Sequence, residues 1–169
     1  MALILNIETS TEVCSVSLAE NGNLVHKKES AEGMNHSRLL TVFIDELFAE
    51  SNVSLKKLDA VAVSKGPGSY TGLRIGVSVA KGLCYGLGIP LISVNSLESL
   101  GIYTAFNYTQ FSGIKPESKP LFCPMIDARR MEVYTALYNT AGEETKPITA
   151  EIITEDFLSA ELGKNRILF

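Results

Sequence analysis

The sequence predicts an α/β protein made of two lobes of one kind in tandem, the second of them incomplete. Short apolar runs alternate with segments of helical spacing through the N-terminal part of the chain. The opening pattern, an apolar run that ends in the carboxylate of Glu8, starts again at Phe122 and ends at Asp127. The last residues, Arg166 to Phe169, form an apolar stub that we expect to be a strand, so the second lobe is predicted to be truncated.

The first three expected elements are strands. Residues 2–7 are a short apolar run typical of a central strand, and residues 13–20 alternate apolar with small or polar side chains. A turn at Asn21–Asn23 leads into a third strand at residues 24–30. A helix is expected from Ser37, because apolar residues then recur with helical spacing.

The remaining elements of the first lobe alternate between strand and helix. Residues 60–64 are an apolar strand, a glycine-rich helix follows at residues 70–87, and residues 90–94 are the next strand. A further helix extends to about Asn107. The order β-β-β-α-β-α-β-α is that of a ribonuclease-H-like lobe, so we assign residues 1–107 to it.

The glycine-rich helix has one face of very small residues. Gly68, Gly72, Gly76 and Ala80 recur at every fourth position. A glycine inside a helix costs roughly 1 kcal/mol relative to alanine, so this pattern needs a reason. The simplest reason is close approach of another backbone, from this chain or from a partner. We therefore expect part of this face to be a contact surface.

The loop before this helix matches no nucleotide-binding signature. A P-loop would require glycine and lysine where Thr71 and Gly72 stand. The dinucleotide fingerprint would need its third glycine at position 71 instead of 72.

A second lobe is expected after a linker at Tyr108–Lys119, so we assign residues 108–169 to it. The run from Phe122 to Asp127 repeats that from Leu3 to Glu8. A helix near residues 155–162 and the strand at residues 166–169 complete the predicted elements. Tandem ribonuclease-H-like lobes define the superfamily of actin-like ATPases, sugar kinases and heat-shock chaperones.

Composition limits the possible functions. The chain has 169 residues, 46% of them hydrophobic and 20% charged, which is ordinary for a globular protein. It has no apolar run approaching the ~18 residues of a membrane span and no basic leader, so a cytoplasmic protein is expected. A net charge of −4 without a basic face argues against strong binding of nucleic acid by this chain alone.

Acidic and hydroxyl side chains follow the first strand of each lobe. Glu8, Thr9 and Ser10 stand where superfamily enzymes place such groups beneath a nucleotide phosphate, and Asp127 is the counterpart in the second lobe. Two plainer interpretations remain open: Glu8 forms a turn and cap, and Asp127 pairs with Arg129 or Arg130.

The sequence contains no recognisable set of catalytic or metal-binding residues. The histidines are His26 and His36, and a catalytic zinc site needs about three protein ligands. No G-x-S-x-G nucleophile motif occurs. The cysteines Cys14, Cys84 and Cys123 form no C-x-x-C pair and are expected to be buried as small hydrophobes.

Five segments carry a resemblance to a known family: Ile7–Ser10, Asn35–Ser37, Gly66–Gly76, Ile126–Arg129 and Glu132–Tyr134. They are similar to the tRNA threonylcarbamoyl transferases (TsaD, once called glycoproteases) and to their shorter bacterial relatives, the TsaB or YeaZ proteins. In the transferase a helix carries a metal-binding H-x-x-x-H pair, and the matching residues here are Ser96 and Leu100. Leucine cannot bind a metal. Glu8 also departs from the pattern, because many relatives have Asp there.

The resemblance to TsaB implies a non-catalytic partner subunit. Its expected partners are the transferase TsaD and the ATPase TsaE, with tRNA bound only through the complex and a homodimer formed by the chain alone. No cofactor is expected to bind tightly, although ATP or ADP could lie at the partner interface. The alternatives are a small-molecule kinase or ATPase of the same superfamily and, less favoured, a metallopeptidase. We expect the interface to contain residues from the first helix and the glycine-rich helix: His36, Leu39, Leu40, Phe43, Gly72, Arg74, Ile75, Gly76 and Val79.

Overall fold

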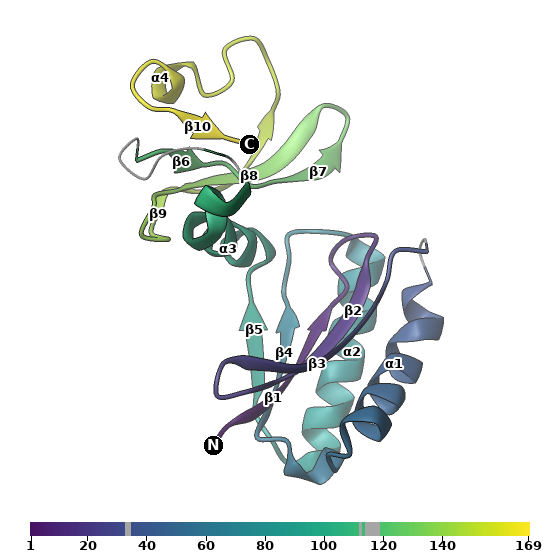
Figure 1. The fold of residues 1–169 in the computed structure, drawn as a ribbon. Helices are drawn as coiled ribbons and strands as arrows, with labels where there is room; N and C mark the ends of the chain where they lie inside the picture. The colour runs from purple at the N-terminus through teal and green to yellow at the C-terminus, as the bar shows by residue number, and fades with distance from the viewer. Residues whose placement is uncertain (33–34, 112, 114–118) are drawn as a thin grey trace. The chain divides into compact units, whose positions relative to one another are not determined.

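The chain folds into two compact units, residues 1–95 and 96–169 (Figure 1). This computed structural model describes residues 1–32, 35–111, 113 and 119–169. The boundary differs from the one predicted after residue 107, because helix α3 (Ser96–Phe111) packs on strands of the second unit. The ring of Tyr138 occupies the space that a Cβ atom on Gly101 would need. Part of the predicted linker is helical, since α3 continues to Phe111; residues 112 and 114–118 lie outside the described residues.

The first unit contains a five-stranded sheet in the order β3-β2-β1-β4-β5. Strands β1, β2 and β3 are antiparallel neighbours, whereas β4 and β5 run parallel to β1. This is the order of a ribonuclease-H-like sheet, as predicted. The elements are β1 (Leu3–Glu8), β2 (Cys14–Glu20), β3 (Asn23–Ser30), α1 (His36–Ser51), the 3-10 helix η1 (Leu55–Lys57), β4 (Ala60–Ser64), α2 (Tyr70–Leu87) and β5 (Leu91–Val94).

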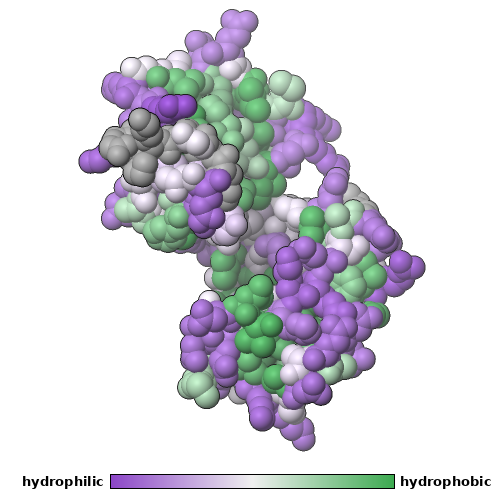
Figure 2. All heavy atoms as spheres, in the orientation of Figure 1, coloured by the Kyte–Doolittle hydropathy of each residue, from purple (hydrophilic) through white to green (hydrophobic). Residues whose placement is uncertain are grey.

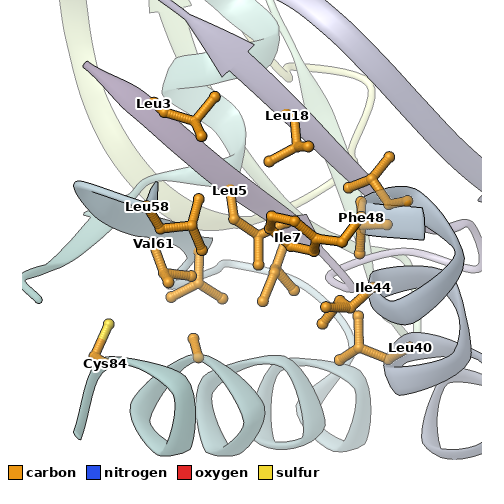
Figure 3. Packing of buried hydrophobic residues seen from close by; sticks show 14 of the residues in the cluster. Leu3, Leu5, Ile7, Leu18, Leu40, Ile44, Phe48, Leu58, Val61 and Cys84 are labelled. Carbon is orange, nitrogen blue, oxygen red and sulfur yellow. The ribbon is translucent and has the colours of Figure 1, made fainter. Parts of the chain in front are cut away.

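Helices α1 and α2 pack on one face of this sheet (Figure 1). Alternate residues of β1 and β2 point toward the helices, because successive side chains of a strand face opposite sides. Leu5, Leu18 and Leu40 are fully buried in the resulting core, which Figure 3 shows from close by. Burial of such a side chain stabilises the folded state by roughly 1.5–3 kcal/mol relative to leaving it exposed.

The second unit repeats this topology in part. Strand β8 pairs antiparallel with β6, β7 and β9, and β10 pairs parallel with β6, as β4 does with β1. The chain therefore contains two ribonuclease-H-like sheets in tandem. The elements that follow α3 are β6 (Leu121–Phe122), β7 (Met125–Arg129), β8 (Glu132–Tyr138), β9 (Glu144–Ile152), α4 (Ser159–Leu162) and β10 (Ile167–Leu168).

Two elements of the second unit differ from the sequence prediction. The strand expected at residues 122–127 is divided into β6 and β7 at Pro124, which has no N–H group to donate to a neighbouring strand. The helix expected at residues 155–162 is only the short α4. Among the helices that the structure describes, none combines the length and apolarity needed to cross a bilayer.

Candidate functional site

Both oxygens of the Glu8 carboxylate accept hydrogen bonds from this chain. Oε1 accepts from the backbone N–H of Ser10 at 2.6 Å, and Oε2 accepts from the hydroxyl of Ser64 at the end of β4. Glu8 is half-buried. The carboxylate thus closes the turn after β1 and ties it to β4, as the interpretation of Glu8 as a turn and cap predicts.

The turn after β1 is packed against the small-residue face of α2. Thr9 and Ser10 are 0% and 2% exposed. A Cβ atom on Gly72 would overlap the Thr9 carbonyl oxygen, and one on Gly76 would overlap the Thr9 hydroxyl. The backbone N–H of Ser69 also donates to the Ser10 carbonyl at 2.6 Å.

This packing corrects one part of the interface prediction. The atoms that approach Gly72 and Gly76, the Thr9 carbonyl oxygen and the Thr9 side chain, belong to the same unit, so these glycines are explained without a partner. They are buried and present no surface to another protein. Helical periodicity identified residues that share a face but not the backbone that lies against it.

The N-terminus of α2 is capped within the chain. The Ser69 side chain accepts a hydrogen bond from the backbone N–H of Gly72 at 3.3 Å. The nearby Thr9 hydroxyl is buried and has no hydrogen-bond partner. The polar groups described above for Glu8, for the turn after β1 and for the start of α2 are therefore hydrogen-bonded within the unit. The Thr9 hydroxyl is the exception.

Asp127 lies in the second unit and is exposed. Its Oδ1 accepts a hydrogen bond from the backbone N–H of Arg129 at 2.7 Å. Arg129, Arg130 and Met131 follow with positive φ angles of 71°, 57° and 64°. The carboxylate thus stabilises the turn between β7 and β8 through the backbone, and it forms no ion pair with the side chains of the two arginines.

Other residues predicted for the interface fall into two groups. His36 and Leu40 are 4% and 0% exposed, so they belong to the interior of the first unit. The half-buried residues pack on the edge of the core, and these are Leu39, Phe43, Ile75 and Val79. They retain part of their surface, so their role at an interface stays a prediction.

Arg74 is the exposed member of the predicted set. Its guanidinium lies 5.4 Å from the centre of the Tyr70 ring, and its Nη1 donates to the Tyr70 hydroxyl at 3.3 Å. Tyr70 and Tyr85 of the same helix are 73% and 93% exposed. These tyrosines were not among the predicted interface residues, although their distance from Gly72, Gly76 and Ala80 around the helix places them on its outer side.

No cysteine of the chain is a strong nucleophile candidate. Cys14, Cys84 and Cys123 are free and buried, as predicted. Burial raises the pKa of each of these thiols. The reactive thiolate form is therefore disfavoured at neutral pH.

The residues at the position of the transferase metal pair do not fit a metal. Ser96 and Leu100 lie one turn apart in α3. Leu100 has no ligating atom and is 45% exposed, and the buried Ser96 hydroxyl has no partner. Within the described ranges no three histidine, cysteine, aspartate or glutamate side chains are grouped so as to hold a metal ion.

Comparison with known proteins places this fold in a family. Residues 28–160 match the family described as TsaD, tRNA N6-adenosine threonylcarbamoyltransferase. A protein of Haemophilus influenzae named tRNA threonylcarbamoyladenosine biosynthesis protein TsaB is 37% identical over 97% of this chain and 67% of its own length. The chain belongs to the TsaB family.

Further relatives agree with this assignment. The TsaB protein of Bacillus subtilis is 37% identical, and the match covers 98% of this TsaB-family chain and 69% of that protein. The solved structure of YeaZ from Pseudomonas aeruginosa superposes with a TM-score of 0.73 at 30% identity, over 90% of this chain and 68% of that one. The chain thus spans about two thirds of the length of these TsaB relatives.

Proposed function

We propose that this chain is a non-catalytic subunit that supports a threonylcarbamoyl transferase in modifying tRNA. The observation that carries the proposal is the combination of TsaB-family membership with Ser96 and Leu100 at the position of the transferase metal pair. The relatives are named for the biosynthesis of tRNA threonylcarbamoyladenosine. The modified nucleoside is the adenosine beside the anticodon in tRNAs that read codons beginning with A.

The proposed partners are a TsaD-type transferase and a TsaE-type ATPase. The net charge of −4 supports tRNA binding through the complex, because a basic surface usually supplies much of the affinity for nucleic acid. The proposed contact surface is the outer side of α1 and α2, with Leu39, Phe43, Arg74, Ile75 and Val79. Exposed Tyr70 and Tyr85 extend this surface, and tyrosine and arginine are enriched among residues that dominate binding energy.

The alternative function, a kinase or ATPase of the same superfamily, finds less support. Such an enzyme would use Glu8 and Asp127 around Mg-nucleotide. Both oxygens of the Glu8 carboxylate accept hydrogen bonds from Ser10 and Ser64, and the Asp127 carboxylate accepts one from the backbone of Arg129. Binding of ATP or ADP at the partner interface stays a prediction.

Reconstitution tests the proposal. The chain by itself should form no threonylcarbamoyladenosine from the adenylate donor and tRNA, and addition of transferase and ATPase should allow synthesis. A mixture of transferase and ATPase without this chain is the control and should be much less active. Modified tRNA made by this chain alone, or full synthesis in its absence, would show that it is not a supporting subunit.

A further inference from the structure

The turn between β7 and β8 holds two arginines in an uncommon backbone conformation. Arg129, Arg130 and Met131 have φ angles of 71°, 57° and 64°. A residue with a side chain seldom adopts this left-handed region, which glycine enters without a steric penalty. The turn nevertheless contains no glycine, and it joins two of the segments that carry the family resemblance, Ile126–Arg129 and Glu132–Tyr134. Because backbone of this kind is concentrated at functional sites, the turn is a candidate binding element.

The side chains of both arginines are available to a partner. Arg129 and Arg130 are exposed, and neither takes part in an ion pair within the part of the chain that the structure describes. The carboxylate of Asp127 accepts a hydrogen bond from the backbone N–H of Arg129 instead. The backbone N–H groups of Arg130 and Met131 donate to no described residue. On the second unit, Figure 2 shows hydrophilic residues where Figure 1 places the end of β7.

These groups suit an anion. A guanidinium group presents five donors in a planar fork that matches the oxygens of a phosphate or carboxylate, and successive free N–H groups of a turn also bind anions. Arginine can contact RNA in a further way, because its planar group stacks on bases. Met131 is 68% exposed and offers an apolar contact to a ribose or base. The polyanion of the proposed function is tRNA, which favours an RNA phosphate over a protein carboxylate.

We propose that this turn binds the phosphate backbone of tRNA after the chain has joined the transferase, with the guanidinium groups of Arg129 and Arg130 on phosphate oxygens. The inference rests on the proposed function, and it names the surface of this chain that touches the RNA. Two cations neutralise few phosphates, so the turn adds to the affinity of the complex without making the chain a strong RNA binder by itself. This agrees with the net charge of −4.

Substitution of Arg130 by glycine separates a binding role from a structural one. Arg130→Gly relieves the positive φ angle, so the midpoint of chemical denaturation should rise. The same variant should raise the dissociation constant of the chain–transferase complex for unmodified tRNA by about threefold to tenfold, and the logarithmic dependence of affinity on salt should become less steep by about one. Arg130→Lys keeps the charge and should bind within about twofold of the unchanged chain. Arg166→Gln, at an exposed arginine of the same unit, is the matched control and should change neither property.

The double variant Arg129→Gln with Arg130→Gln should make the salt dependence less steep by about two. Unchanged tRNA affinity and salt dependence in this variant would overturn the inference. So would loss of its capture by immobilised transferase, which would make the turn a protein contact, and so would weaker binding of ATP with unchanged binding of tRNA, which would assign the turn to a nucleotide.

Synthesis of threonylcarbamoyladenosine with and without the chain is measured in parallel. If the tRNA result fails while synthesis still requires the chain, the inference is wrong and the proposed function stands. Full synthesis in the absence of the chain contradicts the proposed function itself.

Discussion

The Thr9 carbonyl oxygen occupies the space that a Cβ atom on Gly72 would need. The turn after β1 can lie directly on α2 only because this residue has no side chain. The same turn is held from its other side by Glu8, whose carboxylate joins Ser10 to Ser64. The small residues of α2 and the Glu8 carboxylate thus both hold in place the turn that follows β1.

Replacement of Gly72 by alanine should destabilise the first unit. The added methyl would meet the backbone of Thr9, which cannot move without disturbing β1, and overpacking of this kind costs about 1–3 kcal/mol. The free energy of unfolding from denaturant titration is the measurement.

Gly82→Ala is the matched control in the same helix. A Cβ atom there would meet nothing within 4 Å, so alanine should stabilise α2 by up to about 1 kcal/mol. Equal stability changes in the two variants would contradict the packing explanation for Gly72.

Thr9→Val should stabilise the protein or leave it unchanged. The Thr9 hydroxyl is buried without a hydrogen-bond partner, and such a group carries a desolvation cost of about 1–3 kcal/mol that valine avoids. Chemical denaturation gives the change in unfolding free energy.

Thr135→Val provides the comparison, because that hydroxyl is equally buried but bonded. Its Oγ1 donates to the Pro124 carbonyl at 3.1 Å and lies 3.0 Å from Cys123 Sγ. Valine at this position should cost about 1 kcal/mol. If Thr9→Val lowers the unfolding free energy more than Thr135→Val does, the Thr9 hydroxyl has a hydrogen-bond partner in solution.

Local signals predicted the elements of the first unit well. The helix expected at residues 70–87 is α2 with the same ends, because Ser69 caps its start and Gly88 ends it in the left-handed conformation. The strand expected at residues 60–64 likewise matches β4.

Contacts between distant segments could not be predicted in this way. Ser64 is far from Glu8 in the sequence, and nothing local indicates that its hydroxyl donates to that carboxylate. The assignment of α3 to the second unit depends on its fit to Tyr138 through Gly101, which the strand–helix alternation did not reveal.

The purified chain should contain no stoichiometric zinc or iron. Leu100 cannot serve as a ligand, so the metal pair of the transferase is not reproduced in α3. Elemental analysis measures this directly. A content near one metal ion per chain that disappears in His36→Ala would contradict the non-catalytic proposal.

Tyr138 should make the second unit less stable at high pH. Burial, and to a lesser extent Glu144 and Glu98, raise its pKa to about 12. The folded state thus keeps the phenol neutral where the unfolded chain, with a tyrosine pKa of about 10, has already lost the proton. The unfolding free energy should therefore fall as pH rises from about 10 to 12, and this contribution is constant below pH 10.

Tyr138→Phe should remove that part of the decline. The Tyr138 hydroxyl is buried without a hydrogen-bond partner, so phenylalanine gives up no bond and stability at pH 7 should be equal or higher. The measurement is the unfolding free energy at several pH values between 7 and 12, with Tyr85→Phe as the control, since Tyr85 is 93% exposed. A decline of the same steepness in Tyr138→Phe and in the unchanged chain would show that the Tyr138 phenol ionises as readily in the folded protein as in the unfolded one.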